Sequence, residues 1–171
     1  MTLLRSLTAL ALALTLSACA SNEIPEDASA GAGAGVGSGT SGAASPFDPA
    51  SVEYFRAEIG DTVYFATDSS LLTPDAQSTL SRQARWLTDN AGRTATVEGH
   101  ADERGTREYN LALGARRASA VRNFLVAEGV EAERLRSVTY GKERPVALCS
   151  DESCWRQNRR AVTVMADGPT S

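Results

Sequence analysis

Two stretches of the chain carry apolar residues at intervals of three or four, and this helical spacing constrains the fold more than any other feature. Thr73 and Pro74 are typical of a helix start, and Gly92 is typical of the residue past its end. Thr106 and Gly129 bound the second helix in the same way. The apolar positions that share one face are Ala76, Leu80, Ala84, Leu87 and Ala91 in the first helix, and Leu111, Ala115, Ala118, Val121 and Leu125 in the second.

Short runs of β-branched and aromatic residues alternate with these helices. The runs predict strands, and Asp48, Pro49 and Gly60 predict a short helix ahead of the first strand. The predicted strands cover residues 62–66, 94–99, 135–141 and 159–166, and the predicted connection between the last two is a loop. Strands that alternate with long helices are typical of an α/β (α+β) two-layer sandwich, which is the fold class we expect.

The first residues have the features of a targeting segment. Arg5 supplies a positive charge, and residues 7–16 form an apolar stretch of about ten residues, too short for the ~20 that span a bilayer. The LSAC sequence at residues 16–19 resembles the bacterial lipobox, in which a signal peptidase cuts before a cysteine that carries diacylglycerol; the alternative is a chance cysteine near a cleavage site. We expect a signal peptide over residues 1–18 and lipidation of Cys19.

A low-complexity run of glycine, alanine and serine follows this cysteine. Such residues offer too little apolar surface to offset chain entropy, so we expect residues 19–46 to be a flexible tether; the alternative, a silk-like sheet, needs a longer and more regular repeat. A globular domain is predicted over residues 47–168, with a tail over 169–171. Ala20 is not the aspartate that retains lipoproteins in the inner membrane, so the lipobox resemblance implies an outer-membrane anchor with the domain in the periplasm of a Gram-negative bacterium.

The charge balance excludes one class of partner. The chain has 17 Lys and Arg residues against 21 Asp and Glu residues, a formal net charge of −4. This argues against a nucleic-acid-binding protein that relies on a broad basic surface. Lys142 is the single lysine, so we expect any anion site to use the planar guanidinium of arginine.

Cys149 and Cys154 form a pair in the predicted loop. Disulfides persist in exported proteins, so we favour a bridge over two free thiols. A zinc site needs more ligands than one histidine and one cysteine pair supply, and we expect no bound metal and no cofactor.

The densest cluster of charge lies in residues 99–121, where a predicted strand ends and the second helix begins. Asp102 lies in the connecting loop, and Asn110, Leu113 and Arg117 share one helix face. An acid and an arginine fixed in this way suit a ligand that carries both an ammonium and a carboxylate. The alternative for Asp102 is a cap or turn acid.

Other interpretations of the cluster also follow from the residue types. For Arg107, Glu108, Arg116 and Arg122, we expect a solvated helix face. His100, Asp102 and Glu103 suggest a metal or general acid/base site of a periplasmic hydrolase, but their spacing matches no known ligand set and no G-x-S-x-G motif is present.

Four motifs of the chain resemble successive signatures of the OmpA-like peptidoglycan-binding domain and, within it, the peptidoglycan-associated lipoprotein family. They are VYFATDSSLL, VEGHADERGTREYNLALGARRASAV, SVTYGKERP and QNRRAV, and the resemblance covers residues 61–167. It implies a βαβαβ-β domain whose four-stranded mixed sheet has two long helices on one face. It also implies a non-enzymatic protein that binds the diaminopimelate of peptidoglycan stem peptides, with the TolB protein of the Tol-Pal envelope system as a partner. The alternative is an OmpA-like lipoprotein of another envelope complex.

The same resemblance assigns ligand-binding positions. The family's acid corresponds to Asp102 and its arginine to Arg117. Further pocket positions correspond to Asn110, Leu113, Arg104, Asp68 and Thr67. Thr67 stands where close relatives carry an aromatic residue, so a backbone contact is implied there. The loop with Cys149 and Cys154 differs from the enterobacterial form, and no function follows from it.

Overall fold

The structure of the chain is a computed structural model that describes residues 45–166. The predicted signal peptide, the predicted lipidation site Cys19, all but the last two residues of the predicted tether, and the 169–171 tail lie outside the described residues. None of the helices between residues 45 and 166 combines the length and the apolar character that crossing a membrane requires.

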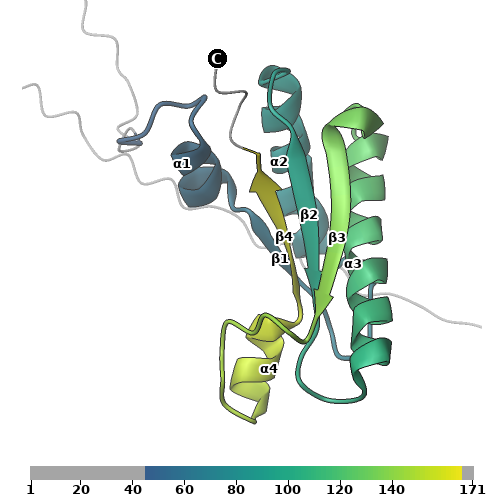
Figure 1. Cartoon of the computed structure of the whole chain (residues 1–171). Helices are drawn as coiled ribbons and strands as arrows, with labels where there is room; N and C mark the ends of the chain where they lie inside the picture. The colour runs from purple at the N-terminus through teal and green to yellow at the C-terminus, as the bar shows by residue number, and fades with distance from the viewer. Residues whose placement is uncertain (1–44, 167–171) are drawn as a thin grey trace, which may run out of the picture. The chain divides into compact units, whose positions relative to one another are not determined.

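Two long helices form one layer of the domain. α2 spans Pro74–Asp89 and α3 spans Arg107–Ala127, and the two helices pack against each other and against the sheet (Figure 1). The side chains of Thr73 and Thr106 cap them by accepting hydrogen bonds from backbone N–H groups in the first turn, which confirms both predicted helix starts. The apolar pattern was wrong at two positions, because Ala91 lies past the end of α2 and Ala115 is exposed on α3.

Four strands form the second layer. β1 spans Thr62–Tyr64, β2 Ala95–His100, β3 Leu135–Gly141 and β4 Arg160–Met165. The order in the sheet is β1-β4-β2-β3, with β2 and β3 parallel and the pairs of β4 with β1 and β2 antiparallel. The predicted two-layer fold with a four-stranded mixed sheet is therefore confirmed.

The remaining elements are short. α1, Val52–Tyr54, continues into a π-helical turn over Phe55–Ile59, and a 3₁₀ turn over Ala132–Arg134 precedes β3. α4 spans Glu152–Asn158, where the sequence predicted a loop. That prediction was wrong because seven residues are too few to show a helical period, although Asp151 caps the helix by accepting a hydrogen bond from the Ser153 N–H.

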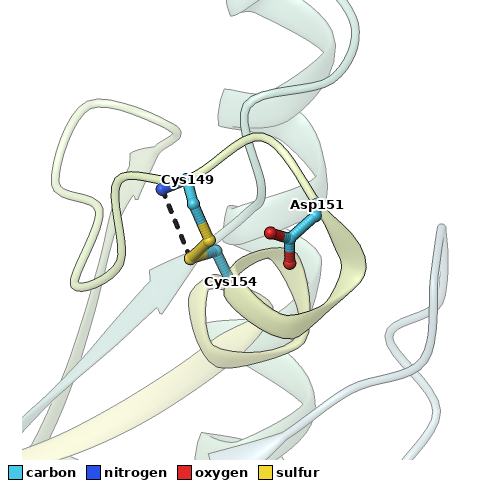
Figure 2. Close-up of side chains that lie close together, drawn as sticks. All are labelled: Cys149, Asp151 and Cys154. Atoms are coloured by element: carbon cyan, nitrogen blue, oxygen red, sulfur yellow. Dashed lines mark hydrogen bonds between the residues drawn. A yellow bond between two sulfur atoms is a disulfide. The ribbon is translucent and has the colours of Figure 1, made fainter.

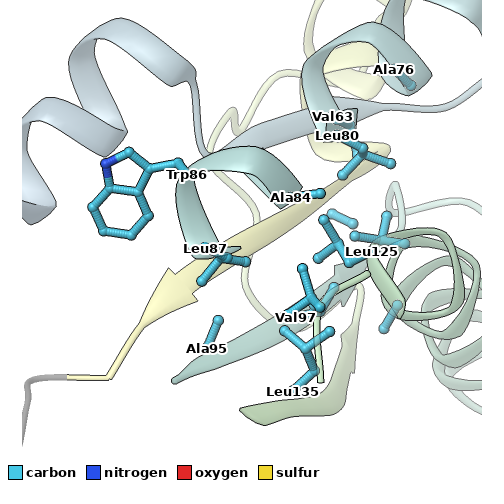
Figure 3. Packing of buried hydrophobic residues seen from close by; sticks show 14 of the residues in the cluster. Val63, Ala76, Leu80, Ala84, Trp86, Leu87, Ala95, Val97, Leu125 and Leu135 are labelled. Atoms are coloured by element: carbon cyan, nitrogen blue, oxygen red, sulfur yellow. The ribbon is translucent and has the colours of Figure 1, made fainter. Parts of the chain in front are cut away.

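The hydrophobic core lies between the helices and the sheet (Figure 3). Leu80 and Leu87 of α2, Leu125 of α3 and Val97 of β2 are completely buried there. Burial of such side chains contributes roughly 1.5–3 kcal/mol each to stability. The core thus fixes α2 and α3 on one face of the sheet.

The backbone at the end of β2 lies so close to the backbone of α3 that no side chain fits between them. A Cβ atom at Gly99 would overlap the carbonyl of Gly114 on α3, and a Cβ at Gly114 would overlap the hydroxyl of Thr139 on β3. Only glycine permits such an approach of backbone to backbone. The contact fixes the distance between α3 and the end of β2. It therefore also fixes the positions of Asn110 and Arg117, which lie about one turn before and after Gly114.

Candidate ligand-binding pocket

Six of the seven predicted ligand-binding residues line one pocket of about 340 Å³. The pocket lies between the loop after β1, the loop after β2 and the first turns of α3. Its lining residues are Thr67, Asp68, Asp102, Arg104, Gly105, Tyr109, Asn110 and Leu113. A larger pocket of about 460 Å³, which extends from Pro49 to Asn90, contains none of the predicted residues.

Asp102 is the acid of this pocket, and it is only 7% exposed. Arg104 engages both carboxylate oxygens: its Nε lies 3.2 Å from Oδ1 and its Nη2 lies 2.7 Å from Oδ2. Arg159, which follows α4, approaches Oδ2 to 3.4 Å. Burial alone would raise the pKa of Asp102, but the hydrogen bonds and charge of Arg104, with a hydrogen bond from Arg159, lower the pKa below its ordinary value. Asp102 is therefore an anion at neutral pH.

Arg117 is the seventh predicted residue, and it lies beneath the pocket rather than in its lining. Its side chain is fully buried on α3. Nε, Nη1 and Nη2 donate hydrogen bonds to the carbonyl oxygens of Ser69, His100 and Ala66 at 2.8, 2.8 and 3.1 Å. Burial lowers the pKa of Arg117 to about 10, an effect that the charge of Asp102 opposes, so the side chain is cationic at neutral pH.

Arg117 therefore connects three segments. The carbonyls of Ala66 and Ser69 belong to the loop after β1, and the carbonyl of His100 ends β2. The same loop carries the predicted residues Thr67 and Asp68, so the buried guanidinium holds one wall of the pocket in place.

The first turn of α3 supplies the opposite wall. Asn110 is buried and its Nδ2 donates to the carbonyl oxygen of Arg104 at 2.7 Å, which fixes the loop after β2. The hydroxyl of Tyr109 donates to Oδ1 of Asp68 across the pocket. Sequence reasoning missed Tyr109, although its position beside Asn110 and four residues before Leu113 could have indicated it.

The acid/base interpretation of His100 and Glu103 does not match their positions. His100 is 2% exposed and does not line the pocket, and its ring packs against Tyr140 with 5.6 Å between ring centroids. Burial, with the nearby charges of Arg160 and Arg144, lowers the pKa of His100 to about 4, so the ring is neutral at pH 7. Glu103 is exposed and accepts a hydrogen bond from Trp155 Nε1 at 3.1 Å. The structure does not bring His100, Asp102 and Glu103 together in one pocket.

Cys149 and Cys154 are joined by a disulfide at the start of α4, with 5.6 Å between their Cα atoms (Figure 2). Their sulfur atoms and a carboxylate oxygen of Asp151 lie within 4.8 Å of one another, the one group of three potential metal ligands among the described residues. Sulfur atoms in a disulfide are not thiolates, so this group does not offer the ligands that zinc prefers.

Most of the remaining charges on α3 have the surface role that the sequence predicted. Arg107, Glu108 and Arg116 are exposed. Arg122 differs, because its Nε and Nη2 each lie 3.0 Å from a backbone carbonyl oxygen, that of Leu135 and that of Ala132 respectively. The prediction for Arg122 was wrong, since this side chain links α3 to the start of β3.

Comparisons with known proteins agree with this architecture. Residues 64–160 match the model of the OmpA family. The chain belongs to the OmpA family. The peptidoglycan-associated lipoprotein of Mesorhizobium japonicum is 60% identical over 126 residues, which cover 74% of this chain and 73% of that protein.

Two solved structures extend the comparison. The crystal structure of the peptidoglycan-associated lipoprotein from Burkholderia pseudomallei is 41% identical, with a TM-score of 0.65 over 70% of this chain and 100% of that one. The C-terminal domain of Helicobacter pylori MotB has a TM-score of 0.60 at 22% identity, over 64% of this chain and 86% of that one, and this likeness shows the fold alone.

Proposed function

We propose that this chain is an outer-membrane lipoprotein, anchored through lipid on Cys19, whose periplasmic domain binds peptidoglycan non-covalently and performs no catalysis. The names of its relatives support association with peptidoglycan. The observation that carries the proposal is the pair of buried charges at one end of the sheet. The anion Asp102 lines the pocket with the five other predicted lining residues, and the cation Arg117 lies next to that lining.

The ligand we propose is the diaminopimelate side chain of a stem peptide. Its free end carries an ammonium and a carboxylate on one carbon. Asp102 accepts the ammonium, and Arg117 faces the carboxylate. Leu113 supplies apolar contact for the methylene groups, and the backbone at Thr67 and the side chains of Asn110 and Asp68 complete the pocket.

Two rearrangements accompany this mode of binding. Arg104 occupies both oxygens of Asp102, so its side chain, 39% exposed, moves aside for the ammonium. A guanidinium has five N–H groups, and Arg117 uses three for carbonyl oxygens, which leaves two for a carboxylate. Because Arg117 is fully buried, the segment over residues 66–69 shifts to admit the carboxylate.

A binding titration tests the ligand. The full-length protein in detergent is titrated with a stem peptide that contains diaminopimelate and with one that contains lysine, which lacks the second carboxylate. We expect the diaminopimelate peptide to bind at least about tenfold more tightly, because the lysine peptide leaves Arg117 without its anion. Equal affinity for the two peptides would contradict the role of Arg117.

Matched variants test the residues. Asp102→Asn keeps the side-chain shape and removes the charge, and we expect it to abolish pull-down of the protein with purified sacculi. Asp75→Asn, an equivalent change at an exposed position of α2, is the control. Arg117→Lys, compared with Arg116→Lys at the exposed neighbouring position, tests the second charge. Retention of sacculus binding in Asp102→Asn would overturn the assignment.

We further propose TolB as the protein partner, within the Tol-Pal system that serves envelope integrity and cell division. The resemblance of the four motifs supports this step. Co-purification of TolB from envelopes is the measurement. Sacculus binding without TolB would favour an OmpA-like lipoprotein of another envelope complex.

A further inference from the structure

The segment between β3 and β4 contacts the loop that carries Asp102, although none of its residues lines the pocket. Figure 1 shows α4 beside the loop that joins β2 to α3. From α4, the Trp155 ring lies 4.2 Å from the guanidinium carbon of Arg104, and Trp155 Nε1 donates to Oε1 of Glu103 at 3.1 Å. One indole ring therefore contacts two consecutive residues of the loop that carries Asp102.

Arg159, the residue after α4, makes the second connection. It is 5% exposed, and its Nη1 lies 3.4 Å from Oδ2 of Asp102. Its Nε donates to the carbonyl oxygen of Phe65 at 3.2 Å, and its Nη2 donates to Oε1 of Glu152. The guanidinium of Arg159 is thus held by the first residue after β1 and by α4.

A disulfide at one end and hydrogen bonds at the other hold α4 in place. The disulfide joins Cys149 to Cys154 in the first turn of the helix. At the other end, Asn158 Oδ1 accepts from the N–H groups of Val146 and Ala147 at 2.8 and 3.2 Å. The helix is therefore a fixed support against which the side chains of the pocket loop pack.

We propose that Trp155 and Arg159 are positioning residues of the pocket: Trp155 holds the Arg104 guanidinium when an ammonium takes its place on Asp102, and Arg159 keeps the Asp102 carboxylate in position for that ammonium. The proposal rests on the proposed function. A guanidinium over an indole face is attracted to it more strongly once it has left a carboxylate, because the anion no longer offsets its charge. The exchange of Arg104 for the ligand is then less costly than release of Arg104 into water.

The first test uses Trp155. Full-length protein in detergent is titrated with the diaminopimelate stem peptide. We expect Trp155→Leu to weaken binding about tenfold, the loss of one strong cation–π contact, and Trp155→Phe to recover most of the affinity. Arg156→Ala, an exposed neighbour on α4, is the control and should bind as the unaltered protein does. Unchanged affinity in Trp155→Leu, or no recovery in Trp155→Phe, would overturn the role of Trp155.

The second test separates positioning from simple support. Affinity is measured from pH 3 to pH 7 for the unaltered protein, Arg159→Gln and Glu152→Gln, with circular dichroism at each pH to follow folding. Removal of the Arg159 charge raises the pH at which binding is half lost, because Asp102 then takes up its proton at higher pH. Glu152→Gln removes a neighbouring negative charge, so it leaves this pH unchanged or lowers it. A uniform loss of affinity with an unchanged midpoint in both variants would overturn the role of Arg159. An unaltered protein that fails to bind the peptide would instead overturn the proposed function.

Discussion

The core between the helices and the sheet differs sharply from the end of the sheet where the pocket lies. The core is apolar, and its buried polar pair, Gln83 and Thr163, is joined by a hydrogen bond of 2.8 Å. The pocket end buries Asp102, Arg117, Arg159 and His100. Three of these four are ions that hydrogen bonds satisfy, whereas the ring nitrogens of His100 have no hydrogen-bond partner.

The difference indicates that the two regions contribute differently to the fold: one to its stability and the other to the positions of particular atoms. Apolar burial stabilises without regard to orientation, so the core determines that the domain folds. Buried ions add little net stability, because desolvation offsets their attraction, but each one requires a specific set of partners. The pocket end therefore determines where particular atoms lie, and it is the region where we propose that a charged ligand binds.

The largest stability effect is expected in the core. Leu80→Ala removes a completely buried side chain and should lower the free energy of unfolding by about 4 kcal/mol through lost burial and the cavity left behind. Leu71→Ala, at a position 80% exposed near the pocket end, should change it by less than about 0.5 kcal/mol. Urea denaturation of both variants gives the two values. Similar losses of unfolding free energy in the two variants would mean that apolar burial in the core contributes no more to stability than an exposed side chain near the pocket.

The second effect is a pH dependence at the pocket end. The pKa of His100 falls from 6.5 in the unfolded chain to about 4 in the folded protein, so the unfolded state takes up this proton first as the pH falls. The contribution is complete above pH 6.5, and about 3 kcal/mol of stability is lost between about pH 6.5 and pH 4.

Denaturation curves across this pH range check the prediction. His100 is the single histidine of the chain, so the difference in pH dependence between the unaltered protein and His100→Phe isolates its titration. Glu98, 3.6 Å from the ring, and the cations Arg144 and Arg160 are present in both proteins. Parallel curves for the two proteins would contradict the assignment.

The third effect concerns the junction of the two regions. Gly114→Ala should lower the free energy of unfolding by about 2 kcal/mol, because the added methyl group overlaps Thr139 and the carbonyl of Gly99. Gly92→Ala, where a Cβ meets no atom within 4 Å, should leave stability unchanged or raise it by about 0.5–1 kcal/mol. Thermal melts of both variants give the sign of each change, and a stabilised Gly114→Ala would show that α3 does not need this close approach.

The smallest effect is expected at the exposed edge of the pocket end. Arg107 Nε lies 3.2 Å from Oε1 of Glu143, and both side chains are well exposed. An exposed ion pair contributes little, so Arg107→Ala should cost less than about 0.5 kcal/mol and should not alter sacculus binding. A larger loss would mean that charge at this end stabilises even without burial.

The sequence could predict the two-layer fold because its signals are local and repeated. Thr73 and Thr106 mark helix starts, and apolar residues recur at intervals of three or four along each helix, with Ala91 and Ala115 as the exceptions. α4 could not be predicted in this way, because a seven-residue helix beside a disulfide presents neither a period nor an apolar face.

The candidate site was predictable in its members but not in its geometry. Spacing and resemblance brought Asp102, Arg104 and Asn110 to one pocket, as the structure places them. They could not show that Arg117 lies beneath the lining or that Arg159 approaches Asp102, since that contact joins positions 57 residues apart. Partners that the folded chain brings together from distant segments leave no trace in local spacing.

The position of β1 has a mechanical consequence. β1 lies at the sheet edge and pairs with β4 through three residue pairs, Thr62 with Val162, Val63 with Ala161 and Tyr64 with Arg160. The pocket wall that Arg117 holds begins directly after this strand. Tension applied between residue 45 and a molecule held in the pocket would act along β1. It would load the hydrogen bonds between β1 and β4 in shear, so that all of them would bear the force together. The short β1–β4 pairing would therefore limit how much pull the domain withstands.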